Sequence, residues 1–95
     1  MKDILKEAQK LQAKLLEELR KIRIEGSAGG GMVKIEMDGE QNVLSVKIDP
    51  QIIEEKDVSM LEDLILAALN DAKSKVTEAT RESFRSITGF PIPGM

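Results

Sequence analysis

Four lysines recur at every fourth position near the start of the chain, and they are the group of side chains most suggestive of a function. They are Lys2, Lys6, Lys10 and Lys14. Successive residues of a helix are turned by about 100°, so a four-residue step keeps these ammonium groups on one broad flank. Such a flank can contact several anionic groups at once by electrostatic attraction. Because the whole chain carries a formal net charge of -3, the positive charge is segregated rather than general.

The same lysines can also be an ordinary solvated surface. Asp3, Glu7 and Glu17 lie among them and can form ion pairs at three-residue spacing, each worth only about 0.2–0.5 kcal/mol. A second cationic group later in the chain has Glu78 and Glu82 among its members, which weakens the case for a function. That group consists of Lys73, Lys75, Arg81 and Arg85.

The composition excludes several classes of chemistry. The chain has no cysteine, so disulfides, thiolate catalysis and cysteine-ligated zinc are ruled out. Histidine, tryptophan and tyrosine are also absent. Acid–base catalysis would have to rest on carboxylates or lysines alone, and none is paired in a pattern typical of a pocket. We therefore predict that the protein is not an enzyme.

Two segments suggest a ligand motif but lack its pattern. The glycine-rich segment, residues 26–31, has no Walker Gly-Lys-Ser/Thr ending and leads into a strand instead of a helix. We expect it to be a flexible hairpin loop. Four acidic residues further on lack the spacing of an EF-hand and are interpreted as a solvated connector. They are Asp49, Glu54, Glu55 and Asp57. No metal or other cofactor is predicted.

The apolar positions near the start of the chain alternate three- and four-residue steps, without proline or glycine, over about residues 3–23. This pattern predicts a long amphipathic helix whose apolar seam lies opposite the lysines. The seam consists of Ile4, Ala8, Leu11, Leu15, Leu19 and Ile22.

A three-stranded antiparallel sheet is predicted over about residues 22–50. Apolar and polar residues alternate in 32–38 and again in 43–49, which indicates two strands with one buried face each. Asp38-Gly39 is a turn signal between them, so the two strands form a hairpin. Ile24, before the glycine-rich segment, predicts the third strand.

A second long helix is predicted over about residues 58–88. Either Asp57 or Ser59 can cap its start, and Ser59 followed by Glu62 has the form of a capping box. The Pro/Gly-rich tail, residues 89–95, ends it. The prediction is therefore an α+β fold, with helix, three strands and helix in one domain over 1–95.

Short strands cannot cover two helices of about 30 and 45 Å. Part of each apolar seam is left over, and an exposed apolar stripe favours association, so we expect a homodimer. The longest apolar run, Leu64–Leu69, is too short to cross a bilayer, and no signal peptide is evident. A cytoplasmic protein is expected.

The sequence resembles the YbaB/EbfC family of bacterial nucleoid-associated proteins, and the resemblance extends over nearly the whole chain. Its most specific part is the helical segment 60–72, MLEDLILAALNDA. Segments 25–35 and 46–50, the Asp38-Gly39 turn and the Pro/Gly-rich end follow in the family's order. The chain lacks the Gly/Met-rich lead-in that members often carry, so contacts made by that lead-in are not expected here.

The resemblance implies a homodimer whose long helices project like the arms of tweezers, and a role in binding DNA at the nucleoid. The expected contacts are Lys2, Lys6, Lys10, Lys14, Lys73, Lys75, Arg81 and Arg85. Contacts of lysine with phosphate do not read bases, so we expect low sequence specificity. Two phenylalanines offer no stacking platform for unpaired bases, which favours duplex DNA.

A protein-interaction adaptor is the alternative hypothesis. Such an adaptor would recruit another protein through its long helices or the tail 89–95, and the overall acidity of the chain is compatible with it. A dimer that ignores DNA at low salt but captures a protein would favour this alternative.

Overall fold

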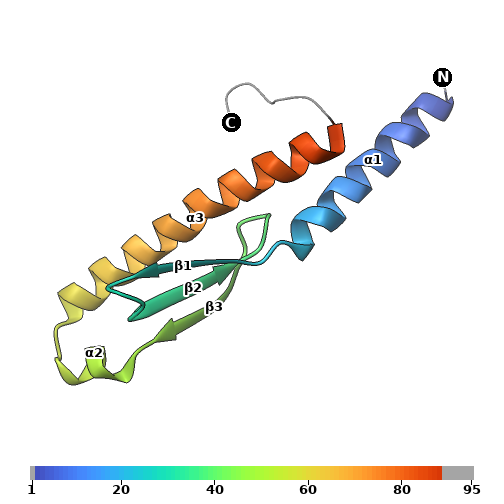
Figure 1. Ribbon diagram of the computed structural model, residues 1–95. Coiled ribbons are helices and arrows are strands. Elements are labelled where there is room, and N and C mark those ends of the chain that lie inside the picture. Colours follow the sequence, from blue (N-terminus) through green and yellow to red (C-terminus); the bar gives the residue numbers. More distant parts are fainter. Residues whose placement is uncertain (1, 89–95) are drawn as a thin grey trace.

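The structure is a computed structural model that describes the backbone of residues 2–88 and the side chains of residues 3–86. The tail 89–95 and the binding role considered for it lie outside the described residues. The predicted α+β order is confirmed, with one short helix added (Figure 1). The elements are α1 (Lys2–Lys21), β1 (Ile24–Ala28), β2 (Val33–Met37), β3 (Val43–Ile48), α2 (Pro50–Glu54) and α3 (Val58–Thr88).

The three strands form one antiparallel sheet in the order β1-β2-β3, and α3 lies along one of its faces (Figure 1). Alternation along β2 turns Val33, Ile35 and Met37 toward α3, and all three are at most 1% exposed. They pack against Ala68 and Ala72 of α3, which are fully buried. The core therefore lies between this face of the sheet and the first half of α3.

Strand β1 is longer than the sequence suggested, because it includes Gly26, Ser27 and Ala28, which were predicted to be a flexible loop. Gly26 is buried where β1 crosses α3, and a Cβ there would lie 2.3 Å from the Ala72 nitrogen and 2.5 Å from the Ala68 oxygen. Only glycine permits this approach of two backbones. The glycine at position 26 therefore serves helix–strand packing.

A short helix, α2, replaces part of the predicted acidic connector. Asp49 caps it by accepting a hydrogen bond from the Gln51 N–H at 2.9 Å, and Pro50 occupies its first turn. Ile52 is 1% exposed and joins the core. Asp57 caps α3, because its Oδ1 accepts from the Met60 N–H at 3.0 Å. Of the two predicted caps for α3, Asp57 is therefore the one used.

The two edges of the sheet differ. Along β1, side chains of α3 reach the outward backbone groups, because the Ser27 N–H donates to Asp71 at 2.9 Å and Lys75 donates to the Glu25 oxygen at 3.3 Å. Along β3, no described element covers the edge. Val43 and Val46, opposite the buried Met37 and Ile35, remain about half exposed. The β3 edge is therefore open and partly apolar.

Candidate functional site

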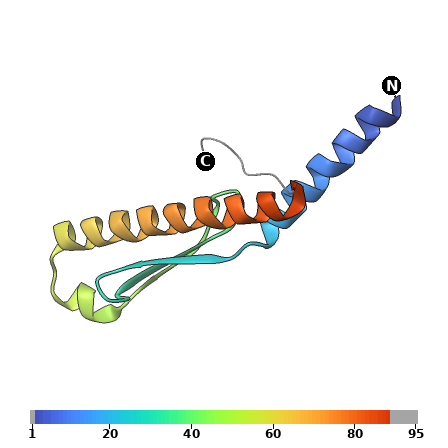
Figure 2. The ribbon, with the colours of Figure 1, turned by 45° about the horizontal axis from the view of Figure 1, so that its top comes forward.

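Helix α1 projects away from the end of the sheet at which α3 also ends (Figures 1 and 2). Lys6, Lys10 and Lys14 lie on this helix and are exposed. Among residues 3–86, no acidic side chain comes within 4.0 Å of any of the three. Lys2 belongs to α1, but its side chain lies outside the described part. The structure therefore presents three predicted contacts as free ammonium groups along one projecting helix.

The pairing expected between these lysines and nearby acids does not form in the described structure. Glu17, which was expected to compensate Lys14, instead lies 3.8 Å from Lys21 one turn further on. Lys21 is also 3.8 Å from Glu18. The acids at the end of α1 thus surround Lys21, and the lysine flank nearer the free end keeps its positive charge.

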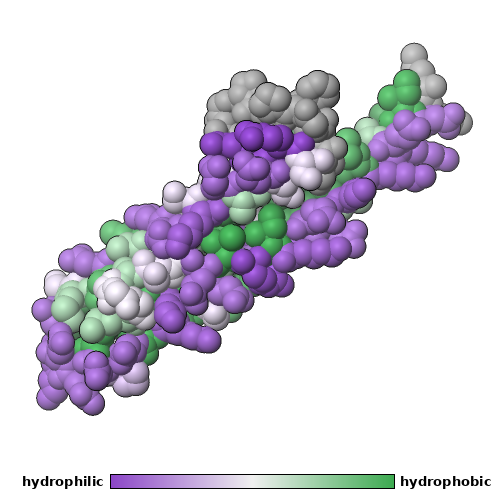
Figure 3. Space-filling view, in the orientation of Figure 1, coloured by the Kyte–Doolittle hydropathy of each residue, from purple (hydrophilic) through white to green (hydrophobic). Residues whose placement is uncertain are grey.

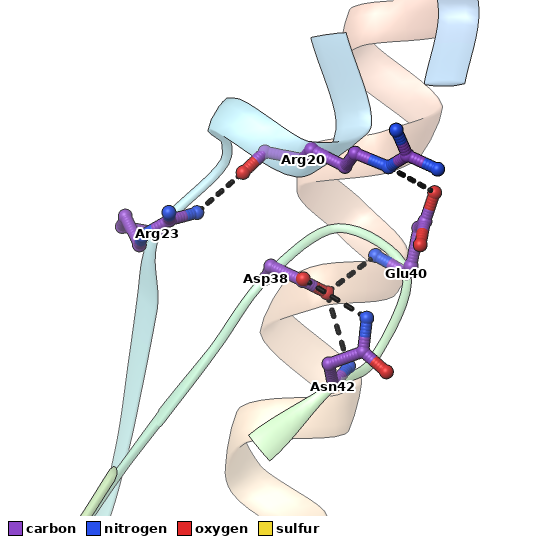
Figure 4. Close-up of polar contacts among 5 residues, drawn as sticks. All are labelled: Arg20, Arg23, Asp38, Glu40 and Asn42. Atoms are coloured by element: carbon purple, nitrogen blue, oxygen red, sulfur yellow. Dashed lines mark hydrogen bonds and ion pairs between the residues drawn. The ribbon is translucent and has the colours of Figure 1, made fainter. Parts of the chain in front are cut away.

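The turn between β2 and β3 fixes the C-terminal end of α1 against the sheet (Figure 4). The Gly39 N–H donates to the Leu19 oxygen at 2.9 Å, and a Cβ at Gly39 would lie 2.5 Å from that same oxygen. Arg20 forms an ion pair with Glu40 across this contact at 3.3 Å. The direction of the lysine-bearing helix is therefore set at its last turn.

Asp38 organises that turn from within. Its side chain is 6% exposed and accepts hydrogen bonds from the Glu40 N–H at 2.8 Å and the Asn42 N–H at 3.0 Å. The Asn42 side-chain amide donates to its second oxygen at 3.1 Å. These donors, the Asn42 N–H above all, lower the pKa of Asp38 below its ordinary value of 3.8, although burial acts in the opposite direction. Asp38-Gly39 predicts a turn here, but the residues of the turn alone do not indicate its role in holding α1.

The second predicted cationic group is divided by the structure. Lys73 and Lys75 lie on the part of α3 that covers the sheet, and Lys75 forms an ion pair with Asp71 at 3.0 Å. The Ser27 N–H, followed by Lys75, lowers the pKa of Asp71 below 3.8. Because Lys75 also donates to the Glu25 oxygen, its ammonium group is engaged in closing the β1 edge.

Arg81 and Arg85 lie closer to the end of α3, on the side of the molecule from which α1 projects. Each is paired with an acid three residues earlier: Arg81 with Glu78 at 3.2 Å and Arg85 with Glu82 at 3.5 Å. The Arg81 side chain is only 29% exposed. The structure therefore brings these two arginines to the end where α1 begins to project, but with their charge partly compensated.

Apolar surface accompanies the cations of α1. Ile4 and Leu5 are 71% and 66% exposed, and Leu11 is 46% exposed. Figure 3 shows this apolar surface near the free end of α1, beside hydrophilic atoms. Further along α1, a hollow of about 250 Å³ separates it from α3 and is lined mainly by apolar atoms. The lining residues are Leu15, Leu19, Thr80, Ser83 and Phe84.

Within the described residues, no helix is long and apolar enough to cross a membrane. The described part of the chain also contains no group of three or more acidic, histidine or cysteine side chains able to hold a metal ion. What the geometry offers is a projecting helix with free cations on one flank and uncovered apolar side chains on another.

Comparison with known proteins gives a consistent result. The sequence model of the YbaB/EbfC DNA-binding family matches residues 1–90. A nucleoid-associated protein of Dictyoglomus turgidum is 48% identical over 90 residues, covering 94% of this chain and 86% of that protein. A nucleoid-associated protein of Legionella pneumophila (strain Corby) is 44% identical over 95 residues, covering 96% of this chain and 84% of its own length.

Among solved structures, the uncharacterized protein HP0035 from Helicobacter pylori is similar, with a TM-score of 0.75. The similarity covers 90% of this chain and 89% of that one, at 24% sequence identity. It therefore supports the fold alone.

Proposed function

Because the chain belongs to the YbaB/EbfC DNA-binding family, we propose that it is a nucleoid-associated protein that binds double-stranded DNA. The proposal places the protein at the bacterial nucleoid, as the names of its relatives indicate for them. It assigns no catalytic residue and no cofactor.

The observation that carries a more specific proposal is the free charge on α1. Lys6, Lys10 and Lys14 are exposed and unpaired among the described residues, on a helix that projects beyond the sheet. A helix presenting ammonium groups at four-residue intervals, about 6 Å apart along its axis, can follow a line of backbone phosphates. We place the main DNA contact on this flank, with Lys2 in the same row and with Arg81 and Arg85 as secondary contacts. Lys73 and Lys75, over the sheet, are the most distant members of the predicted set.

Contacts of this kind position a protein without reading sequence. Each lysine that neutralises a phosphate steepens the dependence of log K on log salt by about 0.9, and none of them distinguishes one base pair from another. The proposed binding is therefore salt-sensitive and of low sequence specificity, as suits a role in chromosome organisation.

We further propose that the functional unit is a homodimer. Two features support it: the open β3 edge with half-exposed Val43 and Val46, and the exposed Ile4 and Leu5 of α1. An uncovered edge strand and an uncovered apolar seam both favour a second copy of the chain. Two copies would double the number of lysine-bearing arms.

The DNA contact is tested with Lys6→Gln/Lys10→Gln. We expect binding to unrelated duplexes to weaken, and the salt slope to fall by about 0.9 for each phosphate that the variant no longer neutralises. The matched control, Lys21→Gln/Lys56→Gln, also removes two exposed charges and should leave the slope close to that of the wild type. Circular dichroism establishes that both variants are folded. Equal slopes for all three proteins would show that Lys6 and Lys10 do not contact the DNA phosphates.

The dimer is tested separately by the mass of the protein in solution. Sedimentation equilibrium of the wild type should give twice the chain mass of 10.5 kDa. Val46→Lys, which places a charge in the uncovered row of β3, should shift the equilibrium toward monomer. A wild type that sediments as a monomer at all concentrations would contradict the dimer but not the DNA contact.

A protein-interaction role has its own supporting observation at the other end of the molecule. Ile53 and Val58, around the connection of α2 to α3, are 62% and 68% exposed. They line a small hollow of about 100 Å³. If the wild type fails to bind duplex DNA at low salt, this apolar end becomes the better candidate for function.

A further inference from the structure

We propose that a second phosphate-binding site lies on the outer face of the sheet, formed by Lys34 and Lys47 beside the glycine turn at residues 29–31. Its ligand is a phosphate group, and the source we favour is the backbone of duplex DNA. In that respect the inference rests on the function proposed above. It concerns a different surface, because the glycine turn lies at the end of the sheet away from α1 (Figure 1).

The two lysines face the same way because of the strand register. Lys34 of β2 is directly opposite Lys47 of β3, and both belong to the face of the sheet away from α3. Directly opposite residues on neighbouring strands have Cβ atoms about 5 Å apart, and like charges placed there repel each other. An anion bound between the two ammonium groups would be attracted to both, which would offset their mutual repulsion.

Neither lysine is neutralised by the described protein. Both are exposed, and among residues 3–86 no carboxylate lies within 4.0 Å of either amino group. Glu36 lies on the same face but is paired in register with Glu25, one step further toward the other end of the strands. The outer face therefore separates its charges into an acidic part and a basic part, with the basic part next to the glycine turn.

The surface is hollowed at this point. A depression of about 310 Å³ is lined by Lys34, Lys47 and Gly31, among others. Gly31 has a φ of +92°, a conformation that favours glycine, and a Cβ there would lie in ordinary van der Waals contact with Lys34 Cε, at 3.5 Å. Asp49 also lines the depression and brings one negative charge to it, and one of its oxygens accepts the Gln51 N–H at the start of α2, so the two lysines outnumber the acid at this point. The depression is large enough for a phosphate group between two flexible cations.

The test uses Lys34→Gln/Lys47→Gln, with Lys21→Gln/Lys56→Gln as the control of equal charge. For duplex DNA, we expect affinity at low salt to fall about three- to tenfold and the salt slope to fall by up to about 1.8 per chain, with little change in the control. Thermal unfolding should show the test variant at least as stable as the wild type, because the substitution removes a repulsive pair. A test variant that binds DNA as the control does would overturn the DNA contact.

A second readout separates the sources of phosphate and does not depend on DNA binding. Inorganic phosphate added to the wild type should shift the NMR amide signals of Gly30 and Gly31, and these shifts should disappear in Lys34→Gln/Lys47→Gln. If the shifts occur while DNA affinity is unchanged, free phosphate is the ligand and DNA is not. If phosphate moves neither signal and DNA affinity is also unchanged, the site is refuted.

Different results would refute the α1 contact and the sheet site. Lys6→Gln/Lys10→Gln should weaken DNA binding but leave the phosphate-induced shifts at Gly31 intact. Loss of DNA binding in this variant alone would support the α1 contact and refute the sheet site as a DNA contact. A wild type that binds no duplex but shows the shifts would refute the proposed function while retaining the phosphate site.

Discussion

The two long helices of this protein both carry cations but are fixed in different ways. The first half of α3 packs along the sheet, where Ala68 and Ala72 meet the backbone of Gly26. Helix α1 is held at its last turn, where Gly39 meets Leu19. One helix builds the core and the other projects from it. Most of α1 is therefore open to solvent along its length, whereas α3 has one side against the sheet.

The cations of the two helices also differ in whether they form ion pairs. On α3, Arg81 and Arg85 are each paired with an acid three residues earlier. On α1, Lys6 and Lys10 also have an acid three residues earlier, yet neither is paired with it. Exposed pairs of this type are worth only about 0.2–0.5 kcal/mol, so similar spacing can give either arrangement. Counting charges along the sequence therefore overestimates the availability of the α3 cations.

The largest expected effect comes from breaking the contact that fixes α3. In Gly26→Ala, the new Cβ would meet backbone atoms of Ala68 and Ala72 at 2.5 Å and below, so α3 must lift from the sheet. We expect the free energy of unfolding to fall by about 3 kcal/mol, measured by urea denaturation. The control is Gly30→Ala, which meets nothing within 4 Å and should cost about 1 kcal/mol for its φ of +68°. Equal losses in the two variants would contradict this account of Gly26.

A smaller effect is expected from Asp38, at the contact that fixes α1. Because the folded state lowers the pKa of Asp38 below 3.8, its carboxylate stabilises the fold above about pH 4, and this contribution is lost as the pH falls through the lowered pKa. Asp38→Asn should therefore be less stable than the wild type at pH 7 and should lose stability less steeply below pH 4. Urea denaturation of the two proteins at pH 7, 4 and 3 measures the difference in stability and its dependence on pH. If the free energies of unfolding of the two proteins change with pH in parallel, the hydrogen bonds to the Asp38 carboxylate do not stabilise the fold.

The smallest effect is expected from the acids paired with the α3 arginines. Glu78→Gln/Glu82→Gln releases Arg81 and Arg85 from their acids, and we expect duplex DNA to bind about two- to fivefold more tightly at low salt. Glu54→Gln/Glu55→Gln makes the same change in net charge near α2, at the opposite end of the molecule, and serves as the control. If the affinity for duplex DNA rises by the same factor in both variants, net charge alone explains the result and the end of α3 has no special role.

Much of the fold could be predicted because its longer elements have periodic patterns of apolar residues in the local sequence. The apolar period of α1 and α3 and the alternation in β2 and β3 each extend over enough residues to identify the element. Helix α2, of five residues, is too short to show a period, although Asp49-Pro50 is a typical helix start. Gly26 could not be assigned to a strand from the neighbouring sequence, because glycine is required there by the close approach of the α3 backbone, more than 40 residues later.

The candidate site could be predicted only in part. The spacing of Lys6, Lys10 and Lys14 placed them on one flank, and the structure keeps them exposed. That Lys34 and Lys47 lie opposite each other depends on the register of two strands, which alternation alone does not fix, and the bulge between Glu36 and Met37 changes it further. The role of the Asp38 turn in holding α1 depends on a contact distant in sequence and left no local signal.

The attachment of α1 by its last turn has a consequence for its stability along its length. An isolated helix shorter than about 12–15 residues is marginal in water, and the first half of this 20-residue helix has only its own backbone hydrogen bonds and neighbouring side chains for support. Protection of its amides from solvent exchange should therefore rise from the free end toward Leu19. A partner that orders the outer turns must offset the conformational entropy lost on ordering them, so we expect the first turns of α1 to be less rigid than the turn at Leu19.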